Sequence, residues 1–179
     1  MKIVQKIVFY STLLVGISYF IFTLSFSSGW ALGEEWFAGF YQEAQIANKL
    51  MYQWALYAVV FAFLSIVFQS HSLRRYSIFN YLFATATIYT MVQAAIITSP
   101  LCRELQASFD QLNPIFVTII TAVNLSSNPD SVFELGHLFS SILWIQSIIL
   151  LVFLVLRFMV RLNAAKANKR YLLENTYEN

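Results

Sequence analysis

Glu134 and His137 have the spacing of a metal-binding pair. In Glu134-Leu-Gly-His137 the carboxylate and the imidazole are three residues apart, on one face of a helix, as di-metal helix bundles require. Such centres need a second pair, and the chain has one other histidine, expected on the opposite side of the membrane. Glu104 and Asp110 would give at most a weak outer metal site. Because Glu134 also ends the capping-box pattern SVFE, a structural role is favoured. We predict no catalytic residue, metal or cofactor.

A second candidate site begins at Asn113 and Pro114. An Asn followed by Pro is typical of a helix start, and the apolar run 114–123 that follows is too short to span a bilayer. It suits a re-entrant or interfacial segment, and re-entrant segments line pores. We also include Gln93, a polar residue of the preceding span, in this candidate pore or outer-loop site. No buried acid or base is identified in the spans, so a loop packed over the bundle is favoured over a pore.

A third candidate site is basic. Arg157 and Arg161 are one helical turn apart near the end of the last apolar run, and Arg74 and Arg75 lie in the short link after the second run. Contact with lipid headgroups explains all four residues. Docking of a cytoplasmic partner on the basic C-terminal helix is the alternative for the first two. We predict no nucleic-acid partner. The net charge of +2 is the sum of a basic inner side and an acidic outer side, and the basic side suits anionic lipid headgroups.

These side chains are positioned by four apolar runs. Only 11% of the 179 residues are charged and 59% are hydrophobic, whereas soluble domains are roughly 25% charged. Runs of about 20 apolar residues can cross a bilayer. We predict an all-α fold, a single four-span membrane domain over 1–179 with short extracytoplasmic helices. The spans are 3–27, 52–69, 78–98 and 135–159, the outer loops 28–51 and 99–134, and the tail 160–179.

The basic residues predict the orientation of these spans. Nine of the eleven fall with the two termini and the link after the second span, and only Lys49 and Arg103 fall on the other side. The positive-inside rule then places both termini in the cytoplasm. We predict a multi-pass protein of a bacterial plasma membrane.

Small residues predict how the spans pack. In lipid, helices associate where small side chains allow close backbone approach. The second span has such a seam at steps of three and four, and the third has one at every fourth position. The link between these spans is short, so they should be antiparallel neighbours. The predicted packing interface comprises Ala55, Ala58, Ala62, Ser65, Ala86, Thr90, Ala94 and Thr98.

Further helices are expected outside the spans. Residues 36–51 form an amphipathic segment, which either lies in the headgroup region or continues the second span. Pro100 should begin a separate short helix over 101–112, with Leu101, Leu105, Phe109 and Leu112 on one stripe. The fourth helix should run to about Lys169 and project into the cytoplasm.

Function is predicted only as a class. The leading hypothesis is a non-catalytic integral subunit that packs, through its small-residue faces, into a larger membrane complex of transport or respiratory type. The alternative is a small self-associating transporter or channel whose path is lined by 113–123. An outward-facing enzyme or metal site at Glu134 and His137 is the third possibility and the least favoured.

Overall fold

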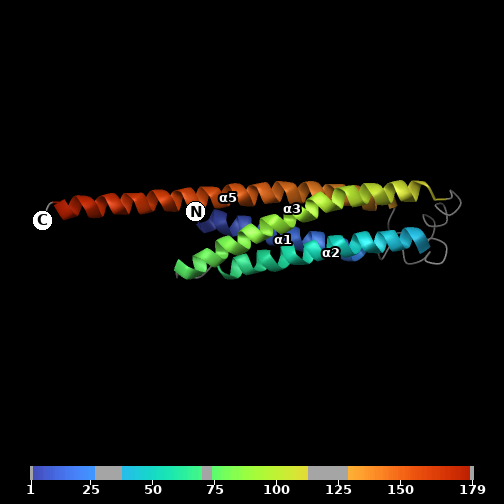
Figure 1. Ribbon diagram of the computed structural model, residues 1–179, viewed down its shortest axis with the longest axis horizontal. Coiled ribbons are helices and arrows are strands. Elements are labelled where there is room, and N and C mark those ends of the chain that lie inside the picture. The colour runs from blue at the N-terminus through green and yellow to red at the C-terminus, as the bar shows by residue number, and fades with distance from the viewer. Residues whose placement is uncertain (1, 27–37, 70–73, 113–128, 178–179) are drawn as a thin grey trace.

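The described residues of the chain form four long helices that pack side by side as an up-and-down bundle (Figure 1). The computed structural model describes residues 2–26, 38–69, 74–112 and 129–177. The helices are α1 (Lys2–Phe26), α2 (Ala38–Val67), α3 (Arg74–Asp110) and α5 (Pro129–Tyr177). Each helix is antiparallel to the next along the chain, so both termini lie at the same end (Figure 1).

All four helices are long and apolar enough to cross a membrane, which confirms the predicted fold class. The apolar stretches are Ile3–Leu24, Gln42–Val67, Ile78–Asp110 and Val132–Ala167. Large aliphatic and aromatic side chains cover the outer faces of the helices, as an apolar solvent permits. The environment that suits this surface is a lipid bilayer.

Around the bundle, α1 packs on α2 and α5, and α3 packs on the same two helices. The α2 seam is fully inside, since Ala55, Ala58, Ala62 and Ser65 are at most 2% exposed. At Gly16 of α1 a Cβ would lie 3.4 Å from Val59 Cγ2, so small residues also bring α1 close to α2.

Helices α2 and α3 extend further than the predicted spans. Residues 38–51 were assigned to an outer loop, and of the two alternatives for the amphipathic segment the structure shows continuation of the second span. The physical reason is its inner face, where Phe40, Ala44, Ala47 and Met51 are buried in the main core. A shared apolar face therefore carries the helix beyond the predicted boundary.

Pro100 lies inside α3, so the prediction of a separate helix after it is wrong. Proline removes one backbone donor and costs about 3 kcal/mol in a helix interior. Packing on both sides of Pro100 offsets this cost, because Thr98 and Cys102 are fully buried. The predicted stripe is nevertheless on the core side: Leu105 and Phe109 are buried, and Leu101 and Leu112 pack against the same core. The expected helix over 114–123 lies outside the described residues.

Helix α5 is longer than predicted. It begins at Pro129, two residues before the expected cap at Ser131, and ends at Tyr177 rather than near Lys169. At 1.5 Å per residue its 49 residues span about 73 Å, so it projects well past the other helices (Figure 1).

Candidate functional site

A cluster of polar side chains lies inside the bundle at the end where the chain begins. There Arg157 of α5, only 7% exposed, donates through Nη1 to Asn80 Oδ1 of α3 at 2.6 Å. Asn80, which is fully buried, donates in turn through Nδ2 to the carbonyl of Ser65 on α2. One arginine thereby ties three helices together. We call Arg157, Asn80, Gln5 and Tyr81 the Arg157 cluster.

Gln5 brings α1 into this cluster. With its amide oxygen turned toward α5, Gln5 accepts from Arg157 Nη1 at 3.0 Å and from Nη2 at 3.3 Å. The same oxygen accepts from Gln69 Nε2 at 3.3 Å. All these partners of the guanidinium are neutral amides, which orient the cation and leave its charge in place.

Tyr81 completes the cluster. Its ring lies 5.0 Å from Arg157 Cζ and 5.3 Å from Arg161 Cζ, both within the range of a cation–π contact. The hydroxyl oxygen of Tyr81 is enclosed, and no hydrogen-bond partner for it exists among the described residues. Two cations one turn apart therefore share one aromatic ring.

The electrostatics of this end follow from the sequence. No Asp or Glu occurs in 1–33, 44–103 or 135–173. Helix α5 places Glu174 seventeen residues beyond Arg157, or about 26 Å along the helix axis. The Arg157 cluster is therefore a positively charged site in which the described hydrogen-bond partners of the Arg157 guanidinium include no carboxylate.

From the sequence, Arg157 is predicted to contact lipid or a partner, and no buried acid or base is predicted inside the spans. The structure differs, because this side chain faces the interior between α1, α3 and α5. Arg161 is exposed, and its predicted lipid or partner contact stays a prediction. The side chains of Arg74 and Arg75, at the start of α3, lie outside the described set.

A spacing pattern locates Arg157 on the inner face. The buried positions of α5 follow alternating steps of three and four, and extending this series from Phe133 reaches Arg157. The same alternation on α3 places Asn80 inside. The sequence therefore contains a signal for both residues, neither of which was predicted to be buried. The α5 series is Phe133, Gly136, Ser140, Leu143, Ser147, Leu150, Leu154 and Arg157.

The predicted packing residues lie inside the chain's own bundle. Of the four on α3, Thr90, Ala94 and Thr98 are at most 3% exposed, and Ala86 is partly buried. Together with the buried α2 seam, they leave little small-residue surface for a foreign helix. Whether any of them contacts another chain stays a prediction.

The remaining predicted sites are not assembled in the described residues. His137 Nδ1 lies 3.1 Å from Ser99 Oγ of α3, whereas Glu134 is exposed. No group of three metal-ligating side chains is found in the described part of the chain. Gln93 is partly buried. Asn113 and Pro114 lie outside the described residues.

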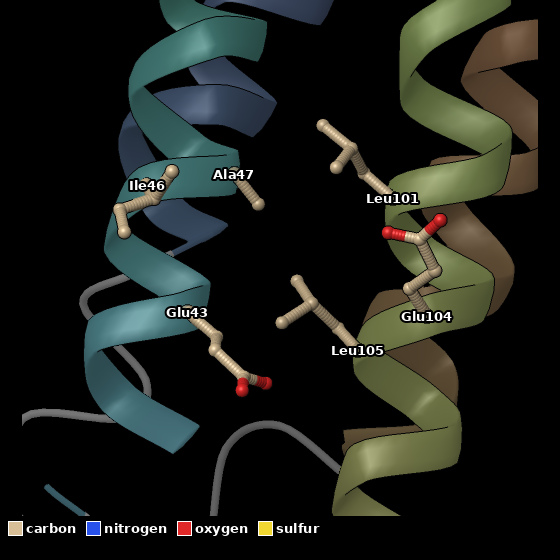
Figure 2. Close-up of a pocket in the computed structure, with 6 residues that line it drawn as sticks. All are labelled: Glu43, Ile46, Ala47, Leu101, Glu104 and Leu105. Atoms are coloured by element: carbon tan, nitrogen blue, oxygen red, sulfur yellow. The ribbon is translucent and has the colours of Figure 1, made fainter. Parts of the chain in front are cut away.

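A shallow groove of about 210 Å³ lies between α2 and α3 at the opposite end of the bundle. Figure 2 shows Ala47, Leu101 and Leu105 pointing into it, with Glu43 and Glu104 on the two facing helices. The lining is mainly apolar, and both carboxylates are exposed. This groove offers less chemistry than the Arg157 cluster, which is therefore the candidate functional site.

Comparisons with protein-family models, with curated proteins and with solved structures give no match, so the function is argued from the chain alone.

Proposed function

We propose that this chain is a non-catalytic integral subunit of a larger membrane assembly of transport or respiratory type. The observation that carries the proposal is the projection of α5. Beyond Arg157 this helix continues for twenty residues, about 30 Å, past the end of α1 (Figure 1). Residues 158–167 are exposed on every side of the helix. A helix without tertiary packing gains little stability from propensity alone, so a partner is the natural source of the missing contacts.

The charges support an orientation for this subunit. Most basic residues, including Lys6 and Arg161, belong to the end from which α5 projects, whereas most acids belong to the other end, among them Glu43, Glu104, Asp110 and Glu134. The positive-inside rule therefore favours a cytoplasmic location for both termini in a bacterial plasma membrane. The projecting part of α5 would meet its partner at or below the inner headgroups.

Purification from the native membrane tests the proposal. A tagged full-length chain in mild detergent should retain foreign subunits in fixed stoichiometry, identified by mass spectrometry. A variant truncated after Ala164 should lose them while its bundle keeps the same unfolding temperature, because residues 165–167, the removed residues whose side chains are described, are exposed. Truncation after Tyr177 is the matched control. A full-length chain that purifies as a homo-oligomer alone would refute the subunit hypothesis.

A second candidate function is a small self-associating transporter or channel. The observation that favours it is the Arg157 cluster, because an ionisable residue inside a membrane bundle often marks a solute path. The chain reconstituted alone in liposomes should then move an anionic solute. Substituting Gln93, Asn113 or Arg157 should change the flux. Absence of flux from well-folded protein would exclude this function.

A further inference from the structure

The hydrogen bonds of Arg157 leave one edge of its guanidinium open. An arginine has five N–H donors. The Gln5 amide oxygen accepts one N–H from Nη1 and one from Nη2. The second N–H of Nη1 is donated to Asn80 Oδ1. Among the described residues no acceptor is found for Nε, and the only other contact of the guanidinium there is with the Tyr81 ring. What remains is Nε–H and the neighbouring Nη2–H, the parallel pair that binds an oxyanion with two hydrogen bonds.

The surroundings of this open edge favour an anion. Arg161 brings a second positive charge onto the same Tyr81 ring, and no acid occurs in the helix stretches that meet here. A cation buried with neutral partners alone keeps an uncompensated charge, which an incoming anion would neutralise. The enclosed Tyr81 hydroxyl is a further donor without a partner in the described chain.

We propose that the Nε–Nη2 edge of Arg157 is a binding site for a phosphate group, at the end of the bundle between α3 and α5. Phosphate is favoured over a carboxylate because its several oxygens can accept from the fork and meet the charge of Arg161 together. The source is either the headgroup of an anionic lipid or a free phosphate. The inference does not depend on either proposed function.

Two pairs of probes test the site on the full-length chain in mild detergent. Phosphatidylglycerol is compared with diacylglycerol of the same acyl chains, which lacks the phosphate. Sodium phosphate is compared with sodium chloride at equal ionic strength. We expect phosphatidylglycerol, sodium phosphate or both to raise the unfolding temperature, and their controls to have no effect. A rise with the lipid alone identifies the headgroup as the source. A rise with the salt identifies free phosphate only if Arg157→Lys lacks it, because phosphate also stabilises proteins without binding.

Variants then assign the effect to Arg157. Arg157→Lys keeps the charge without the fork and should weaken retention of the probe, measured by native mass spectrometry, roughly tenfold or more. Arg161→Gln, at an exposed position, should weaken it by a smaller factor. Arg103→Gln, exposed at the other end, is the matched control and should change nothing.

Clear results would overturn the proposal. Equal stabilisation of the wild type by phosphatidylglycerol and diacylglycerol, with no effect of sodium phosphate, shows that the phosphate group is not recognised, even if no Arg157 variant folds. If Arg157→Lys retains the probe as well as the wild type does, the Nε–Nη2 edge of the guanidinium is not the binding site. A foreign subunit lost from Arg157→Lys, without any phosphate effect on the wild type, would assign the edge to a protein carboxylate instead.

Discussion

Replacing Gly136 by alanine tests the closest approach between α3 and α5. A Cβ at Gly136 would overlap Cys102 Sγ, and it would also lie 3.4 Å from Cys102 Cβ and 3.6 Å from Phe22 Cζ. Cys102 is fully buried, so its sulfur cannot swing into open space. The two helices must then separate, and overpacking of this kind costs about 1–3 kcal/mol. The better helix propensity of alanine returns up to about 1 kcal/mol.

A double-mutant cycle isolates the steric term. Cys102→Ala removes the sulfur and makes room for the new methyl group. In that background Gly136→Ala should therefore stabilise the bundle by up to about 1 kcal/mol, whereas alone it destabilises it by about 0–2 kcal/mol. The coupling should reach about 1–3 kcal/mol. Gly39→Ala is the control, because a Cβ at Gly39 meets nothing within 4 Å.

The assay is equilibrium unfolding in mixed micelles of a mild detergent and dodecyl sulfate, followed by tryptophan fluorescence. The four proteins of the cycle and the Gly39→Ala control are measured under identical conditions. If Gly136→Ala has the same effect with and without Cys102, to within about 0.5 kcal/mol, the two residues are not in contact. The packing of α3 on α5 described above would then be wrong.

Three further substitutions are measured by the same unfolding assay. Gln146→Leu removes the donor that joins α5 to two α1 hydroxyls and should cost about 0.6 kcal/mol, whereas Ser141→Ala at an exposed site should be neutral. Ala94→Leu overfills a position with 0% exposure and should cost about 1–3 kcal/mol, whereas Ile96→Leu on the lipid-facing side should stay within about 0.5 kcal/mol. Pro100→Ala restores a backbone donor within a continuous α3 and should stabilise the bundle by up to about 3 kcal/mol. A loss of stability there would favour a helix that restarts at Pro100.

The fold could be predicted because the sequence patterns that indicate it extend over many residues. Apolar runs of membrane length and the distribution of arginines and lysines each average over many residues. The helix ends could not be predicted equally well, because they depend on tertiary packing. Phe40 and Phe109, outside the predicted spans, contact each other with ring centroids 5.7 Å apart. Their helices continue beyond the expected boundary because each buries its face on the other, and Pro100 is accommodated for the same reason.

The candidate site was harder to predict because two features of Arg157 disagree. Its residue type predicts contact with headgroups, whereas its position on the helix predicts burial. An arginine close to the end of an apolar run normally reaches toward the headgroups, which is the interpretation given to Arg157 from its position. Its place in the alternating series from Phe133 instead puts it on the inner face of α5. The partners Gln5 and Asn80 come from distant parts of the chain. Only the packing of α1 and α3 around α5 shows that they meet.

Neutral partners of Arg157 leave its charge available, and Gln5→Glu tests whether that matters. A carboxylate at this position would meet Nη1 and Nη2 where the amide oxygen now lies, 3.0 and 3.3 Å away. The new ion pair is partly exposed, so it should stabilise the bundle by at most about 1 kcal/mol. The same charge cancels the cation, so retention of phosphatidylglycerol or phosphate should fall about tenfold although the protein is at least as stable. Gln5→Leu, which removes the acceptor without adding charge, separates the two effects because it should lower stability and preserve binding better. If Gln5→Glu raises stability and leaves phosphate binding unchanged, Arg157 serves only to hold the helices together.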